Sequence, residues 1–84
     1  MKVRCIIIDD EPSSQNILKS FVEKVSFLDL KAVLDNAEEA NDYLVDHTID
    51  LLFLDINMPR LSGIEFFSSL ESKPKVIFTT AYAK

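Results

Sequence analysis

Four short apolar runs, separated by segments with helical spacing, constrain the fold of this chain more than any other feature. The runs cover residues 3–8, 30–34, 51–54 and 76–78, and each is rich in β-branched or aromatic residues without polar alternation. Continuous apolar runs of this length are typical of strands buried on both faces, as in a parallel sheet. Their alternation with helices predicts an α/β domain with helices on both faces of the sheet and right-handed crossovers.

Three helical patterns occupy the intervals between the predicted strands. Apolar side chains fall at residues 17, 18, 21, 22 and 25 in the first, at 37, 40 and 44 in the second, and at 64, 67 and 70 in the third. Ser62 and Glu65 have the spacing of a capping box, and Asn36 and Glu39 resemble one. We therefore expect the second and third helices to begin just after Asn36 and Ser62.

Acidic or hydroxyl residues follow all four predicted strands, with Asp35 after the second. Asp9 and Asp10 come after the first strand, Asp55 after the third and Thr80 after the fourth. A parallel sheet brings the carboxyl ends of its strands to one edge, and open α/β sheets bind their ligands there. We therefore expect the side chains after the first, third and fourth strands to converge, although they are far apart in the sequence.

Three carboxylates gathered at one edge repel one another. At 4 Å and an effective dielectric near 20, each pair costs about 4 kcal/mol. A hard divalent cation with oxygen ligands, Mg²⁺ above all, relieves this repulsion. We expect Asp10 and Asp55 to bind it directly, Asp9 through water and Asn57 through its backbone carbonyl. A carboxylate beside such a cation can act as a nucleophile toward phosphorus, and the Thr80 hydroxyl can donate to a phosphoryl oxygen.

Composition and charge narrow the function classes. The formal net charge is -5, which disfavours direct nucleic-acid binding by this segment because phosphate anions would be repelled. The single cysteine, Cys5, excludes an internal disulfide, in keeping with a reducing compartment. The sequence shows neither a secretory signal nor an apolar stretch of membrane-spanning length, so we expect a cytoplasmic location without membrane association.

Three motifs stand out along the chain. The first is the stretch from Cys5 to Pro12, which ends an apolar strand on an acidic pair. The second begins at Asp55, with Pro59 four residues later and Gly63 eight residues later. The third runs from residue 76 to 81 and ends in a hydroxyl residue followed by a small one. Together these motifs resemble the receiver domains of two-component response regulators. They occur in that family's order and span nearly the whole chain.

The resemblance implies a three-layer flavodoxin-like fold with strand order 2-1-3-4-5. It implies that Asp55 accepts a phosphoryl group from a sensor histidine kinase in a Mg²⁺-dependent reaction, and that the domain is a signalling module rather than an enzyme. Ala81 leaves room for the phosphodonor, while Asn57 and Tyr82 match positions that tune dephosphorylation.

Two further residues of the second motif have structural explanations. Pro59 stiffens the loop after Asp55 because its ring fixes φ. Gly63 lies by a helix start, where we expect backbone freedom to be useful.

The chain departs from the family pattern at its C-terminal end. Receiver domains continue through a further helix, strand and helix, and their fifth strand carries a lysine that pairs with the phosphoryl group. Lys84 is too close to Thr80 to take that place. We therefore expect residues 1–84 to be a receiver domain truncated after the fourth strand. The exposed edge and face predict marginal stability or self-association. Residues 78–82 resemble regulators with a LytTR-type DNA-binding output domain, so a transcriptional output domain is expected outside this chain.

Two other functions are left open by the residues. A phosphohydrolase with an aspartyl nucleophile often uses a second carboxylate two residues later, where this chain has Asn57. A pseudo-receiver that only mediates interactions would not need the acidic set and Thr80, which are present here. Turnover of a phosphomonoester would indicate the first, and failure to bind Mg²⁺ or a phosphoryl mimic would indicate the second.

Overall fold

The computed structural model describes residues 2–80, which form four strands and three helices in strict alternation. The elements, in chain order, are β1 (Val3–Ile8), α1 (Pro12–Glu23), β2 (Leu28–Leu34), α2 (Ala37–Asp46), β3 (Leu51–Asp55), α3 (Gly63–Ser69) and β4 (Lys75–Thr79). The order of elements predicted from the apolar runs is confirmed.

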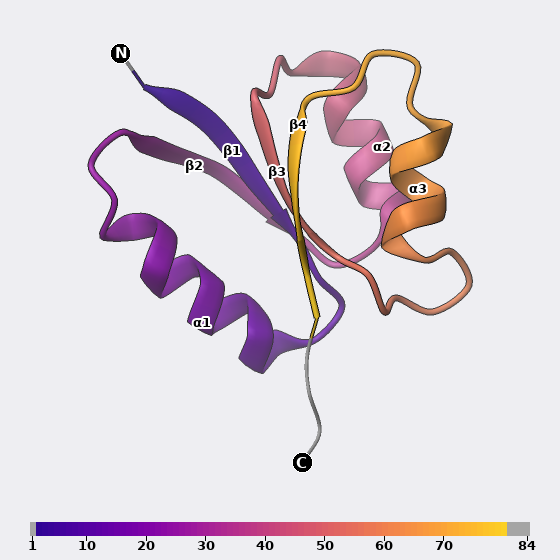
Figure 1. The fold of residues 1–84 in the computed structure, drawn as a ribbon, viewed down its shortest axis with the longest axis horizontal. Coiled ribbons are helices and arrows are strands. Elements are labelled where there is room, and N and C mark those ends of the chain that lie inside the picture. The colour runs from indigo at the N-terminus through magenta and orange to yellow at the C-terminus, as the bar shows by residue number, and fades with distance from the viewer. Residues whose placement is uncertain (1, 81–84) are drawn as a thin grey trace.

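The four strands form one parallel sheet in the order β2-β1-β3-β4. Figure 1 shows α1 on one face of this sheet and α2 and α3 together on the other, so the molecule has three layers. The flavodoxin-like class is therefore confirmed for the described part of the chain. In the register, Ile8 lies beside both Leu34 and Leu54, while Asp55 lies beside Thr79. The carboxyl ends of the strands thus meet at one edge.

Two hydrophobic clusters fill the spaces between the layers. Alternate residues of β1 point to opposite faces, because side chains alternate along a strand. Ile6 and Ile8 join the larger cluster under α2 and α3, and Cys5 and Ile7 join the smaller one under α1. β1 is consequently buried on both faces, as its uninterrupted apolar run predicts.

The helix faces differ from the predicted stripes in two places. Phe66 in α3 and Leu70 just after it are buried, whereas Ile64 is 52% exposed and not part of the apolar face. Phe66 and Leu70 are four residues apart, so they share one side of the helix, and Ile64 lies well away from it. In α1, Val22 is buried, but Ile17 and Phe21 remain exposed on the flank.

The helix starts follow the capping signals only in part. α3 has the complete capping box: Glu65 N–H donates to Ser62 Oγ (3.2 Å), and Ser62 N–H donates to Glu65 Oε1 (3.1 Å). At α2, Glu39 N–H donates to Asn36 Oδ1 (2.8 Å). The Glu39 carboxylate instead accepts from the N–H of Asp35, so this second box is not reciprocal. Within residues 2–80, none of the helices has the length and apolar character that a membrane span requires.

Candidate functional site

Three carboxylates from two neighbouring strands meet at the carboxyl edge of the sheet. Asp9 and Asp10 follow β1, and Asp55 is the last residue of β3. Each contributes an oxygen, and these oxygens all lie within 4.8 Å of one another. Asp9 and Asp55 are only 3% and 4% exposed, whereas Asp10 is exposed to solvent. The register of β1 and β3 therefore brings together the acidic residues that the sequence predicts to converge.

A cavity of about 310 Å³ opens beside this acidic cluster. Its lining residues are Asp10, Glu11, Pro12, Asp55 and Asn57. The cavity gives a small charged ligand access to the carboxylate of Asp55 from solvent.

Burial and charge repulsion act together on Asp55. Loss of hydration, followed by the nearby carboxylates of Asp9 and Asp10, raises the pKa of the Asp55 carboxyl to about 6. The backbone N–H of Asn57 donates to Asp55 Oδ1 over 3.0 Å and opposes the shift. A carboxyl group whose ionised form is disfavoured in this way is a candidate functional group, because groups with shifted pKa values are concentrated at functional sites.

Asp9 is held by contacts that the sequence did not indicate. Burial raises the pKa of its carboxyl, although the N–H of Glu11 donates to Asp9 Oδ1 over 2.9 Å and lowers it. The side-chain amide of Gln15 donates to the backbone carbonyl of Asp9 (2.5 Å) and to Asp35 Oδ1 (2.7 Å). Gln15 therefore connects α1 with the ends of β1 and β2. A lone polar residue one turn into a helix gives no signal for such a role.

Thr80 follows β4. It is connected to Asp55 of the acidic cluster by Asn57, which makes a hydrogen bond to each of these two residues. The side-chain amide of Asn57 donates to Thr80 Oγ1 over 3.1 Å, across 23 positions of sequence. The N–H of Ile56 donates to the carbonyl of Thr79 over 2.9 Å, which extends the pairing of β3 with β4 to this edge. The other two candidates at this strand end, Ala81 and Tyr82, lie outside the described residues.

The loop that follows Asp55 returns closely to its own start. The N–H of Gly63 donates to the carbonyl of Ile56 over 3.0 Å. A Cβ atom on Gly63 would overlap the carbonyl oxygen of Asp55 and would lie 2.9 Å from its carbonyl carbon. The φ of Gly63 is not positive. The absence of a side chain, and not the expected backbone freedom, is therefore what this position requires.

A tight turn lies inside the same loop, just after Pro59. The N–H of Leu61 donates to the carbonyl of Pro59 over 2.8 Å, and Arg60 between them has φ 71°. This combination is that of a γ-turn with a positive central φ, a rare and strained conformation for a residue with a side chain.

The acidic cluster has the donor set of a site for a hard cation. All its side-chain donors are carboxylate oxygens, and a cation bound there would favour the ionised form of Asp55, whose pKa burial and the neighbouring carboxylates raise. Mg²⁺ prefers a few carboxylate oxygens and retains several waters, which the adjoining cavity can accommodate. The residues present therefore fit Mg²⁺.

Comparisons with known proteins agree with this fold. Residues 5–84 match the family model of the response regulator receiver domain. The transcriptional regulatory protein BtsR of Escherichia coli K12 is 35% identical over 82 residues, which are 95% of this chain and 34% of that protein. The sensory transduction protein LytR of Staphylococcus epidermidis is 34% identical over 85 residues, 98% of this chain and 34% of that protein.

A solved structure gives the same result at the level of the fold. The MaeR response regulator bound to beryllium trifluoride superposes with a TM-score of 0.86 at 27% identity, covering 98% of this chain and 70% of that one. The chain belongs to the receiver domains of two-component response regulators, which are signalling domains. It spans about a third of the length of the curated relatives that it matches.

Proposed function

We propose that this domain accepts a phosphoryl group on Asp55 from a sensor histidine kinase, in a reaction that requires Mg²⁺. The observation that carries the proposal is the burial of the Asp55 carboxylate beside those of Asp9 and Asp10, next to an open cavity. Three carboxylates so close together favour a bound cation, and a carboxylate beside such a cation can act as a nucleophile toward phosphorus.

The proposed magnesium ligands are Asp10, Asp55 and the backbone carbonyl of Asn57, with Asp9 acting through a water molecule. When bound, Mg²⁺ supplies positive charge that offsets the repulsion between the carboxylates and the incoming phosphoryl oxygens. The N–H of Asn57 keeps Asp55 Oδ1 fixed in orientation, and the N–H of Glu11 does the same for Asp9 Oδ1.

In the proposed step, a carboxylate oxygen of Asp55 attacks the phosphorus of a phosphohistidine on the kinase. A bond forms between that oxygen and phosphorus, and the bond between phosphorus and the histidine nitrogen breaks. The electron pair of the broken bond stays on the imidazole nitrogen. The product is an aspartyl phosphate, a carboxylic–phosphoric anhydride.

Thr80 is the proposed hydrogen-bond donor to the new phosphoryl group. Its oxygen accepts the Asn57 amide, which leaves the hydroxyl hydrogen available for a phosphoryl oxygen. The small residue Ala81 is proposed to leave access for the phosphodonor. Asn57 and Tyr82 are proposed to tune how quickly water removes the group.

The role of the whole protein is also a proposal, because the chain spans only a third of its curated relatives. Residues 1–84 are proposed to lack the last helix, strand and helix of the receiver, and phosphorylation to switch an output domain outside this segment. BtsR is a transcriptional regulatory protein, which supports a transcriptional output. The net charge of -5 disfavours DNA binding by this segment, which supports the assignment of DNA contacts to the output domain. The proposed compartment is the cytoplasm, where Cys5 remains a thiol.

The proposal is tested on the natural gene product that contains this sequence, incubated with acetyl phosphate and Mg²⁺. Intact-mass spectrometry should show the gain of one phosphoryl group, stable in acid and removed by hydroxylamine, as expected of an acyl phosphate. The variant Asp55→Asn should not gain it.

The matched control is Asp42→Asn, which removes an exposed carboxylate on α2. This variant should be labelled as the natural protein is. An undiminished adduct in Asp55→Asn would refute the assignment of the acceptor, and an adduct that forms equally well in EDTA would refute the requirement for Mg²⁺.

A further inference from the structure

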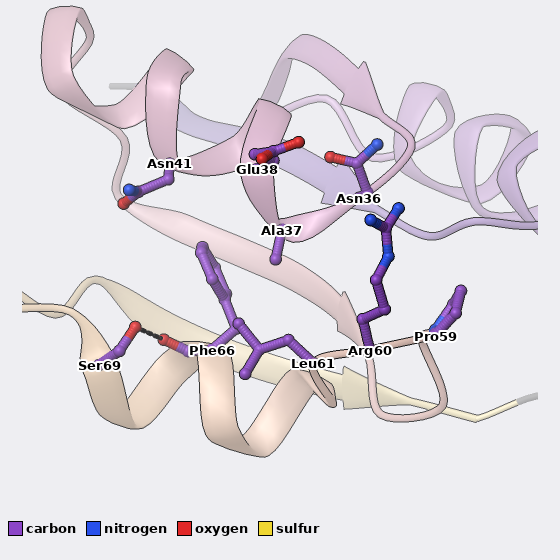
Figure 2. Close-up of a pocket in the computed structure, with 9 residues that line it drawn as sticks. All are labelled: Asn36, Ala37, Glu38, Asn41, Pro59, Arg60, Leu61, Phe66 and Ser69. Carbon is purple, nitrogen blue, oxygen red and sulfur yellow. Dashed lines mark hydrogen bonds between the residues drawn. The ribbon is translucent and has the colours of Figure 1, made fainter.

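A second cavity lies between α2 and the loop before α3, away from the acidic cluster. Its volume is about 330 Å³, and Figure 2 shows its walls formed by the start of α2 above and by the loop and α3 below. That volume is at the lower end of the range for sites that bind small molecules. The function proposed above makes no use of this cavity.

The floor of the cavity is apolar. Ala37 projects from α2 toward the side of the cavity that holds Phe66, and Leu61 lies beside Phe66 in the loop before α3 (Figure 2). Phe66 itself is anchored in the core under α2 and α3. A flat apolar group placed here would leave water and contact a rigid surface, so the floor favours a ring or a short hydrocarbon body.

Hydrogen-bond donors gather at one end of the cavity. The Arg60 guanidinium reaches toward Asn36 (Figure 2). The two ion pairs found among residues 2–80 are Arg4 with Asp50 and Lys31 with Asp29, so Arg60 is not engaged in either. Asn36 Oδ1 already accepts the Glu39 N–H, which leaves the NH₂ group of Asn36 as a donor. A guanidinium is planar and matches a carboxylate with two parallel hydrogen bonds.

The γ-turn explains how Arg60 comes to this position. A residue with φ 71° turns its side chain away from the direction that an ordinary loop residue would give it. Strain of this kind persists only where the surrounding structure enforces it. Glu38 is the opposing feature, because its carboxylate also lines the rim and repels an anion.

We infer that this cavity binds a small aromatic carboxylate, with its ring on Ala37, Leu61 and Phe66 and its carboxylate on Arg60 and Asn36. The apolar floor and the donors at one end select a molecule with one flat apolar part and one anionic end. The two charged rim residues change the affinity for an anion in opposite directions. Arg60 strengthens binding, and Glu38 weakens it.

The test is a titration of the full chain with 2-naphthoate, followed by amide resonances in ¹H–¹⁵N NMR spectra. Shifts should concentrate at the amides of residues 36–41 and 60–69. The neutral analogue 2-naphthamide should bind about tenfold more weakly, because hydrogen bonds between two charged groups are stronger than those of a neutral amide.

Three variants separate the parts of the site. Arg60→Gln should weaken 2-naphthoate binding about tenfold, and Glu38→Gln should strengthen it about threefold, since the two changes move the local charge in opposite directions. Ala37→Leu should abolish binding by filling the cavity. The first two substitutions are at exposed side chains, so the charge test does not depend on how well the third variant folds.

Four results would overturn the inference. They are shifts scattered over the whole surface, equal affinity for 2-naphthoate and 2-naphthamide, unchanged affinity in Arg60→Gln, and weaker binding in Glu38→Gln. Equal affinity for the two probes would show an apolar site without anion selectivity. Scattered shifts would show that the cavity is not a site for this class of molecule.

Discussion

Gly63 lies against the backbone of Asp55, so close that a Cβ atom at Gly63 would overlap the Asp55 carbonyl oxygen. The contact joins the first turn of α3 to the last residue of β3. It ties the stability of the loop between them to the position of the candidate phosphoacceptor.

Substitution Gly63→Ala should therefore destabilise the fold. We expect a loss of about 2 kcal/mol in the free energy of unfolding, as is usual for an added methyl group that meets backbone atoms. Urea unfolding followed by circular dichroism measures it. Ser68→Ala, an exposed change in the same helix, is the control and should alter stability by less than about 0.5 kcal/mol. Equal midpoints for the two variants would contradict the contact.

The pKa of Asp55 predicts how stability depends on pH. Its folded-state pKa is raised to about 6 from the ordinary 3.8, so the folded protein holds this proton where the unfolded chain has lost it. The stability contributed by Asp55 is therefore present at low pH, falls between about pH 4 and pH 6, and stays low above that range.

Asp55→Asn should consequently be more stable than the natural chain at pH 7, by about 1 to 2 kcal/mol, and equally stable near pH 4. Parallel urea titrations at the two pH values measure this difference, without Mg²⁺. Asp42→Asn supplies the comparison and should show the smaller effect at pH 7. A natural chain more stable than Asp55→Asn at pH 7 would show that the acidic cluster is not strained.

Mg²⁺ should stabilise the fold through the acidic cluster. At a concentration ten times its Kd, a ligand that binds only the folded state adds about 1.4 kcal/mol to the free energy of unfolding. We expect Asp10→Asn to lose most of this gain and Asp46→Asn, at an exposed position near the end of α2, to retain it. Thermal unfolding with and without Mg²⁺ measures both, and EDTA should reverse the effect. An equal gain in the two variants would place the cation elsewhere.

The γ-turn at Arg60 predicts an unusual response to glycine. A positive φ costs a residue with a Cβ roughly 1 kcal/mol, and glycine avoids that cost. Arg60→Gly should therefore be more stable than Arg60→Ala by about 1 kcal/mol, although glycine normally destabilises a chain relative to alanine. Both variants lack the guanidinium, so their difference isolates the backbone. Urea unfolding measures the difference in stability between the two variants. A more stable alanine variant would rule out the positive φ.

An isolated polypeptide of residues 1–84 is expected to self-associate along β4, which is an edge of the sheet in the described part of the chain. Ile77 on this strand is 48% exposed, near the face that α1 covers. Sedimentation velocity should show association that increases with concentration. Ile77→Lys should reduce it, and Ile64→Lys, the same change on the outer side of α3, should not. A polypeptide of residues 1–84 that stays monomeric up to high concentration would contradict the prediction.

Much of the fold could be predicted because strands and helices leave periodic traces in a sequence. The run Leu51 to Leu54 needs only its own composition to be interpreted as a buried strand, and Ser62 with Glu65 marks a helix start by local chemistry alone. The errors arise where packing chooses between faces. Phe66 and not Ile64 enters the core, because the direction from which α3 meets the sheet is set by its neighbours.

The order of elements and the identity of the acidic residues were determined by the sequence itself, since each depends on residues close together along the chain. The contacts of the site were decided only by the tertiary structure. Gln15 reaching Asp9, Asn57 reaching Thr80 and Arg60 bordering a cavity with Asn36 all join residues from different elements. Such contacts depend on strand register and on one strained turn, and a hydrogen bond that forms only when distant segments meet leaves no periodic signal in the chain.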